Sequence, residues 1–245
     1  MNALRCGDRE VHPQVRTLRE MQSVVFDRDW LRTADLDQPL YLMYRNCVLP
    51  EDKQIAHELH VRYDITVLLP VMLGCEYNKT KGHYHSEYKP GLCYPELYQV
   101  LEGQAHVLLQ KRSGDTVSDV VLVVAHEGEI VLVPPNYGHI TINPTEKTLR
   151  MANWVSTKVQ SFYEPFEQKG GGAYFVTSPP APPLKREGVG KGLGLFIPNP
   201  QYSALPPLRV ERAREYPELG LRHGRPIYEL IKTPERLRFL SYPDE

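Results

Sequence analysis

Residues 95–135 read PELYQVLEGQAHVLLQKRSGDTVSDVVLVVAHEGEIVLVPP, and they contain four short runs rich in Val, Leu and other β-forming residues. The runs are separated by turn-forming sequences at residues 102–103, 113–115 and 126–129, each of which contains a glycine. Strand-like runs broken at this spacing are typical of antiparallel barrels and sandwiches. We therefore expect an all-β fold in which these three connections are hairpins.

The same cadence continues on both sides of this stretch. Further β-rich runs bounded by Gly, Pro, Asn or Asp lie at residues 39–50, 61–74, 139–144 and 148–156. Ahead of them, residues 15–35 are charged and mixed, which predicts one or two short helices that dock on the core through Met21, Val25 and Trp30.

The chain changes character again after residue 177. Pro and Gly dominate residues 178–207, which predicts an extended, irregular strap. Apolar spacing returns at residues 225–245, so this part is expected to pack on the domain. We therefore predict an N-terminal cover over residues 1–38, a β-barrel over 39–177, and a strap with a C-terminal extension over 178–245.

Composition excludes some classes of partner. Lys and Arg total 29 against 30 acidic residues, so the chain has no net basic field to hold nucleic acid or an anionic membrane. No apolar run approaches the length of a membrane span. The four cysteines show no CxxC pairing, and no signal-like apolar run opens the chain, so we expect free thiols in a cytoplasmic protein.

Two histidines lie just ahead of the quoted stretch, in the sequence TKGHYH at residues 80–85. Because side chains alternate faces along a strand, His83 and His85 should point the same way. Glu96 begins the next strand, with Tyr98 on the same face, and His139 follows the turn after VPP. We expect His83, His85, Glu96 and His139 to bind one metal ion.

This donor set suits a divalent transition metal. Three imidazoles and one carboxylate are compatible with Fe(II), Mn(II), Ni(II), Zn(II) or Co(II), of which we expect Fe(II) first. Four protein ligands would leave positions open for the oxygens of a substrate.

The histidine and glutamate pattern resembles the two motifs of the cupin superfamily, whose members fold as a double-stranded β-helix or jelly-roll barrel. Asn136 stands where that family usually has glycine, and asparagine tolerates the positive φ that such a turn needs. More narrowly, residues 15–177 resemble the cupin-type phosphoglucose isomerases through TKGHYH, PELYQVLEGQAHVLLQ and VPPNYGHITIN. These enzymes interconvert glucose 6-phosphate and fructose 6-phosphate in glycolysis and gluconeogenesis.

The resemblance implies a function for several residues. It assigns Tyr98 to the sugar site. Glu96 is the well-placed base in the motif for moving a proton through a cis-enediol, and a metal-promoted hydride shift is the alternative. The resemblance also implies a homodimer. The residues that it places against the phosphate are Tyr41, Thr66, Thr80, Gly82 and Tyr163. By contrast, Val155 and Ser161 stand where the family has larger polar or aromatic side chains.

Two other functions use the same ligand set. A cupin dioxygenase holds Fe(II) with three histidines and a glutamate, and a non-catalytic sugar-binding cupin needs no chemistry at all. A phosphate-binding set favours the isomerase, because an oxygenase of small organic acids has no need of one.

Overall fold

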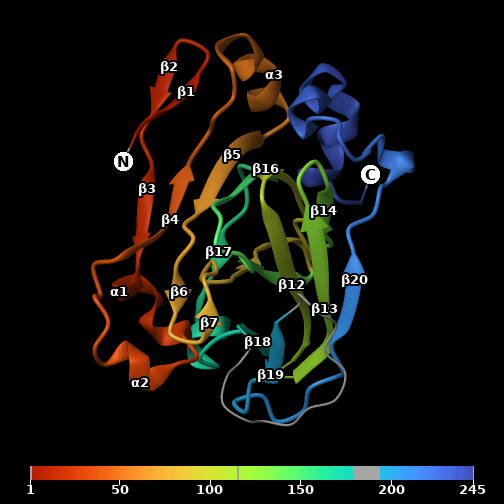
Figure 1. Ribbon diagram of the computed structural model, residues 1–245. Coiled ribbons are helices and arrows are strands. Elements are labelled where there is room, and N and C mark those ends of the chain that lie inside the picture. The colour runs from red at the N-terminus through yellow and green to blue at the C-terminus, as the bar shows by residue number, and fades with distance from the viewer. Residues whose placement is uncertain (1, 115, 179–193, 245) are drawn as a thin grey trace.

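Two β-sheets face each other and form a barrel in the computed structural model, which describes residues 2–114, 116–178 and 194–244 (Figure 1). The larger sheet has, in order, β14 (Ile130–Val133), β11 (Glu96–Glu102), β16 (Leu149–Ser156), β5 (Val61–Leu68), β4 (Pro39–Tyr44) and β3 (Gln14–Thr17). The smaller sheet has, in order, β15 (Tyr137–Ile142), β12 (Gln104–Ser113), β13 (Thr116–His126) and β20 (Arg209–Arg212). The expected all-β barrel is confirmed.

Two of the three connections predicted as hairpins are not hairpins. Only β12 and β13 pair with each other across their turn, with Ser113 opposite Thr116. The connections at residues 102–103 and 126–129 pass from one sheet to the other. Gly103 makes the first of these corners at φ +87°, where an added Cβ would lie 2.8 Å from the Thr148 carbonyl oxygen. A side chain is excluded there, so the chain can turn sharply into the second sheet.

Short strands extend the barrel at its ends. A further four-stranded sheet has the order β19 (Leu195–Pro198), β18 (Tyr174–Thr177), β7 (Glu76–Tyr77) and β6 (Met72–Leu73). Three two-stranded pairs are formed by β1 (Leu4–Cys6) with β2 (Arg9–Val11), β8 (Tyr84–His85) with β17 (Ser161–Phe162), and β9 (Glu87–Lys89) with β10 (Leu92–Cys93).

The N-terminal segment forms the short helices α1 (Leu18–Met21), η1 (Gln22–Val24) and α2 (Arg28–Leu31). Met21 and Val25 are fully buried in the core between the sheets, and Trp30 packs against it, as expected. Residues 14–17 are not helical, because they form β3, the edge strand of the larger sheet, whose backbone groups pair with β4.

The remaining helical segments are η2 (Pro50–Asp52), α3 (Lys53–Glu58), α4 (Glu164–Gln168), η3 (Pro217–Leu219), η4 (Ile227–Lys232) and η5 (Pro234–Leu240). No helix among the described residues is both long and apolar enough to cross a bilayer.

A second core lies on the outer face of the larger sheet, where η4 and η5 pack against β16. Trp154 is fully buried there, stacks on Tyr228 at 5.7 Å between ring centroids, and donates a 2.8 Å hydrogen bond from Nε1 to the carbonyl of Ile227. The C-terminal segment therefore covers one side of the barrel. The division at residues 38 and 177 stays a prediction, and residues 179–193 of the predicted strap lie outside the described residues.

Candidate metal centre

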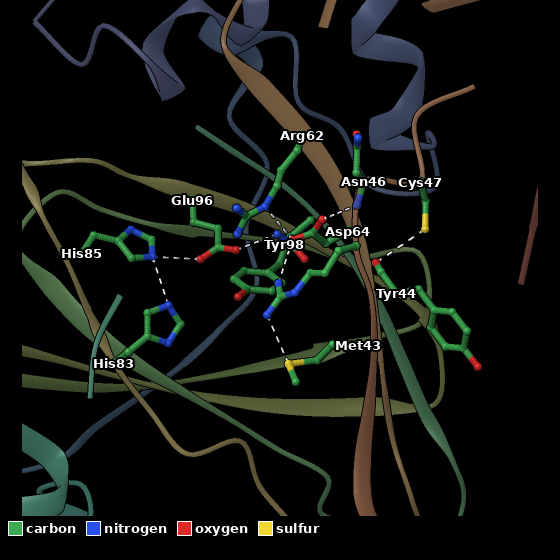
Figure 2. Close-up of polar contacts among 12 residues, drawn as sticks. Met43, Tyr44, Asn46, Cys47, Arg62, Asp64, His83, His85, Glu96 and Tyr98 are labelled. Carbon is green, nitrogen blue, oxygen red and sulfur yellow. Dashed lines mark hydrogen bonds and ion pairs between the residues drawn. The ribbon is translucent and has the colours of Figure 1, made fainter. Parts of the chain in front are cut away.

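Three histidines and one glutamate converge inside the barrel. His83, His85, Glu96 and His139 each place a ligand atom within 4.8 Å of the others. His83 Nε2 lies 3.2 Å from His85 Nε2, and Glu96 Oε2 lies 3.2 Å from His85 Nε2 and 3.3 Å from His139 Nε2. Figure 2 shows Glu96, His85 and His83 in this cluster.

Backbone pairing brings the two histidine segments together. The amides of His83 and His139 each donate to the carbonyl of the other residue, at 3.3 and 3.1 Å. Tyr84 points the opposite way and contributes no ligand atom. Its ring lies over Gly138, where an added Cβ would come within 2.6 Å of the ring. The predicted alternation of the HYH segment is confirmed.

The protonation pattern of the cluster fits a cation. His85 Nδ1 lies 2.9 Å from the carbonyl oxygen of Tyr94, which can only accept, so Nδ1 carries the hydrogen and Nε2 presents a lone pair. That lone pair faces Glu96 Oε2, which accepts no hydrogen bond from the described residues. Lone pairs turned toward each other in a buried site repel unless a cation lies between them. The residues present therefore fit a divalent metal, whose identity the fold does not select.

Burial sets the charge of the ligand residues. It lowers the pKa of His83 well below its ordinary value, an effect to which His139 and His85 add, and it lowers the pKa of His139 as well. Burial alone would raise the pKa of Glu96, but His139 and His85 outweigh it and hold that pKa well below its ordinary value. The shifts thus favour neutral imidazoles at His83 and His139 and an ionised carboxylate at Glu96.

A buried amide holds the other oxygen of Glu96. Asn153 Nδ2 donates to Glu96 Oε1 at 2.7 Å, and the two side chains lie on the paired strands β16 and β11. Because Oε1 is held in this way, Oε2 is fixed toward the histidines. Asn153 is 2% exposed and Glu96 4%, so water does not compete for this bond.

Tyr98 follows Glu96 on the same face of β11. Its hydroxyl lies 3.2 Å from His139 Nε2. Burial raises the pKa of Tyr98 well above its ordinary value, and the Glu96 carboxylate adds to the effect. The phenol therefore keeps its proton beside the ligand cluster.

The residues that the resemblance placed against a phosphate all line the same cavity as the four ligand residues. They are Tyr41, Thr66, Thr80, Gly82 and Tyr163. The Thr80 hydroxyl accepts a 2.9 Å hydrogen bond from the amide of Thr141, which leaves its own proton available. Gly82 has φ +82°, and an added Cβ would lie 2.6 Å from Ile140 Cγ1, so a side chain is excluded at this position. Their role toward a phosphate stays a prediction.

The sequence pattern of one protein family, described as Glucose-6-phosphate isomerase (GPI), matches residues 15–181 of the chain. The matched region contains all four residues of the cluster and the cavity lining described above. The chain belongs to the glucose-6-phosphate isomerase family.

Similar members of this family come from species of Thermococcus and Pyrococcus. The chain is 31% identical over 134 residues to a glucose-6-phosphate isomerase of Thermococcus litoralis, and this alignment covers 54% of the chain and 64% of that protein. The chain is 33% identical over 131 residues to a glucose-6-phosphate isomerase of Pyrococcus furiosus, and this alignment covers 53% of the chain and 62% of that protein. The chain thus spans less than two thirds of the length of these relatives.

Solved structures show a weaker likeness. An oxalate oxidase matches with a TM-score of 0.35 and 16% identity, over 51% of this chain and 52% of the other. Hazelnut vicilin matches with a TM-score of 0.38 and 12% identity, over 50% of this chain and 32% of the other.

Four lining or supporting residues of this family member were not predicted from the sequence. They are Arg45, Arg62, Asp64 and Asn153. A signal was present for two of them, because Arg62 and Asp64 alternate with Thr66 in VRYDITV and so share the inward face of β5. Asn153 gave no such signal, since its neighbours in TLRMANWVS are mostly apolar.

The long spacer between His85 and Glu96 forms the hairpin of β9 and β10. Asn136, at φ +71°, accepts from the amide of Cys93 at 2.8 Å and donates to the carbonyl of Gly91 at 2.9 Å. The predicted positive φ of Asn136 is confirmed. Its side chain also fixes the spacer through these two hydrogen bonds.

Proposed function

We propose that this chain is a metal-dependent aldose-ketose isomerase that interconverts glucose 6-phosphate and fructose 6-phosphate. The observation that supports the proposal best is the convergence of His83, His85, His139 and Glu96 in one cavity of a glucose-6-phosphate isomerase family member. The residues expected to contact phosphate line the same cavity. A single sugar phosphate would thus reach both groups.

The metal would be held by the four residues of the cluster, and Fe(II) is the ion we expect in the cell. A divalent cation bound there would polarise the carbonyl and the adjacent hydroxyl of the substrate. The residues of the chain would then have to bind the phosphate, hold the sugar and move one proton.

Glu96 is the residue we propose as the base. Its pKa is held below the ordinary value, so the carboxylate is ionised at neutral pH and can accept the proton from C2 and return it to C1 through a cis-enediol. The Asn153 amide fixes the orientation of the carboxylate during this transfer. Tyr98 keeps its phenol proton and would donate a hydrogen bond to a substrate oxygen.

The opposite part of the cavity would bind the phosphate. The Thr80 hydroxyl, the backbone amide of Gly82 and the Tyr163 hydroxyl would supply neutral hydrogen bonds. Lys81, although adjacent, is paired with Glu167 at 2.5 Å and adds little net charge there.

The test is turnover of fructose 6-phosphate by protein reconstituted with Fe, Mn, Ni, Zn or Co, followed through a dehydrogenase specific for glucose 6-phosphate. We expect His83→Ala and His139→Ala to abolish activity. We expect Glu96→Gln to reduce activity by a larger factor than it reduces metal affinity. His126→Ala is the matched control, because His126 is exposed and lies outside the cluster. Absence of turnover with every metal would refute the proposal.

The proposal extends to the setting of the reaction. We expect a homodimer that acts in the cytoplasm, and light scattering at several concentrations would test the dimer. A parallel assay with mannose 6-phosphate would show whether the sugar specificity is broader.

A further inference from the structure

A pair of arginines lines the cavity at the level of the ligand cluster. Arg62 on β5 lies opposite Val155 on the neighbouring strand β16, and Val155 lies opposite Glu96 on β11. Arg62 and Glu96 therefore lie at the same level of the sheet. Thr66, one of the residues expected at the phosphate, lies four positions further along β5. At roughly 3.3 Å per residue, the two positions are about 13 Å apart. Arg62 and Thr66 thus lie at different levels of the cavity wall.

A buried carboxylate holds both arginines. Asp64 is 0% exposed, and its Oδ2 accepts from Arg45 Nη1 at 2.7 Å and from Arg62 Nε at 2.9 Å. Its Oδ1 accepts from the amide of Asn46 at 2.8 Å (Figure 2). With three donors to one carboxylate, the two guanidinium groups are fixed in position before any ligand arrives.

Arg62 has more hydrogen-bonding capacity than Asp64 uses. Only its Nε is engaged, and its two terminal amino groups donate no hydrogen bond to the described residues. The side chain is 31% exposed and lines the cavity. A guanidinium with its terminal nitrogens free is suited to bind a planar anion through two parallel hydrogen bonds.

The charge balance leaves room for an anion. Arg45 and Arg62 cancel the charges of Asp64 and Glu96, so that a divalent metal in the cluster would leave the metal end of the cavity positive. A purely structural role would need one guanidinium to neutralise Asp64, and Arg45 already supplies it at 2.7 Å. Arg62 is therefore the group available for a ligand.

We propose that Arg62, positioned by Asp64 and Arg45, forms a second anion-binding subsite beside the metal centre, separate from the phosphate residues. Its ligand is negative charge on the substrate oxygens at C1 and C2. In the reaction this is the charge of the enediolate, and in a stable compound it is a carboxylate at C1 of a sugar phosphate. The inference rests on the proposed function, since the metal centre and the phosphate residues define the two ends of the substrate.

The test compares two ligands that differ only at C1. These are 6-phosphogluconate, which carries a carboxylate there, and glucitol 6-phosphate, which carries a hydroxymethyl group. Their dissociation constants are measured by calorimetry with metal-loaded protein, so the metal contributes equally in wild type and variants. Because a paired, charge-assisted contact is lost, we expect Arg62→Gln to weaken binding of 6-phosphogluconate by about 10- to 100-fold and binding of glucitol 6-phosphate by less than about 3-fold.

Two further variants control the experiment. Arg150→Gln removes a guanidinium from the same sheet, where Arg150 is exposed and pairs with Glu102, and we expect it to change neither constant. Arg62→Lys keeps the charge and a partner for Asp64 but lacks the planar fork, so it serves if the glutamine variant fails to fold. We expect it to lose about 3-fold or more in affinity for 6-phosphogluconate alone.

Equal losses for both ligands would overturn the inference, because Arg62 would then support the cavity or bind the phosphate. Unchanged binding of both ligands, or no binding of either to wild type, would overturn it as well. The proposed function is judged separately, by turnover of fructose 6-phosphate. A chain without turnover that still discriminates the two ligands through Arg62 would refute the isomerase and retain the subsite.

Discussion

Replacing Asn153 with leucine tests whether the amide that holds Glu96 also sets the affinity for metal. The substitution keeps a side chain of similar volume and removes the donor to Glu96 Oε1, which lies 2.7 Å away. The carboxylate then loses the contact that turns its other oxygen toward His85 and His139.

The size of the effect follows from the burial of the pair. Asn153 and Glu96 are 2% and 4% exposed, so water cannot replace the lost donor. A hydrogen bond to a charged group contributes about 1.5–3 kcal/mol, and about 1.4 kcal/mol is a tenfold change in an equilibrium constant. We therefore expect Asn153→Leu to weaken metal binding by about 10- to 100-fold, the usual range for a residue that orients a metal ligand.

The assay is calorimetric titration of Mn(II) into chelator-treated protein, with a thermal melt to show that the variant is folded. Arg150→Gln is the matched control, because Arg150 lies on the same strand and is exposed. Metal affinity of Asn153→Leu within about twofold of wild type, in a folded protein, would refute the idea that Asn153 acts through a metal-binding Glu96.

Three further predictions concern stability. Burial, with a smaller contribution from a neighbouring histidine, lowers the pKa of His106 from 6.5 to about 4. Folding thus favours the neutral form of His106, and about 3 kcal/mol of stability should be lost as the pH falls from 6.5 to 4. Chemical denaturation across this range should show that the free energy of unfolding of His106→Gln depends less on pH than that of wild type. An unchanged pH dependence would contradict the assignment. Trp154→Phe removes the 2.8 Å hydrogen bond to the carbonyl of Ile227 and should lower the free energy of unfolding by about 1 kcal/mol. Hydrogen exchange in residues 227–240 should become faster. Exchange as slow as in wild type would show that the bond does not hold the C-terminal segment. Gly82→Ala places a methyl group 2.6 Å from Ile140 Cγ1 at φ +82°, and should lower the free energy of unfolding by about 1–3 kcal/mol; equal denaturation midpoints would rule out this close approach.

The sequence by itself determined the barrel and which four side chains converge inside it. The strand-like runs are confirmed as β4, β5 and β11–β16, because alternating apolar residues fix both the extended conformation and the buried face. The cluster was predictable for the same reason. The spacing of HYH sets two imidazoles on one face, and the turns ahead of Glu96 and His139 mark where the next strands begin.

Only the tertiary structure decided how the strands are shared between the sheets. The connections after Glu102 and His126 have hairpin-like sequences, yet they cross from one sheet to the other. A glycine at positive φ permits either path, and the choice depends on which sheet offers the next strand a partner.

The polar support of the site was also decided by the tertiary structure. Asn153 lies 57 residues from Glu96, and Asp64 lies 19 residues from Arg45, so pairing between different strands brings each pair together. A buried amide or carboxylate in an apolar run has no local signature, because its partner lies on another strand. The sequence therefore specified which residues could bind a metal, and the fold selected which residues orient them and line the cavity.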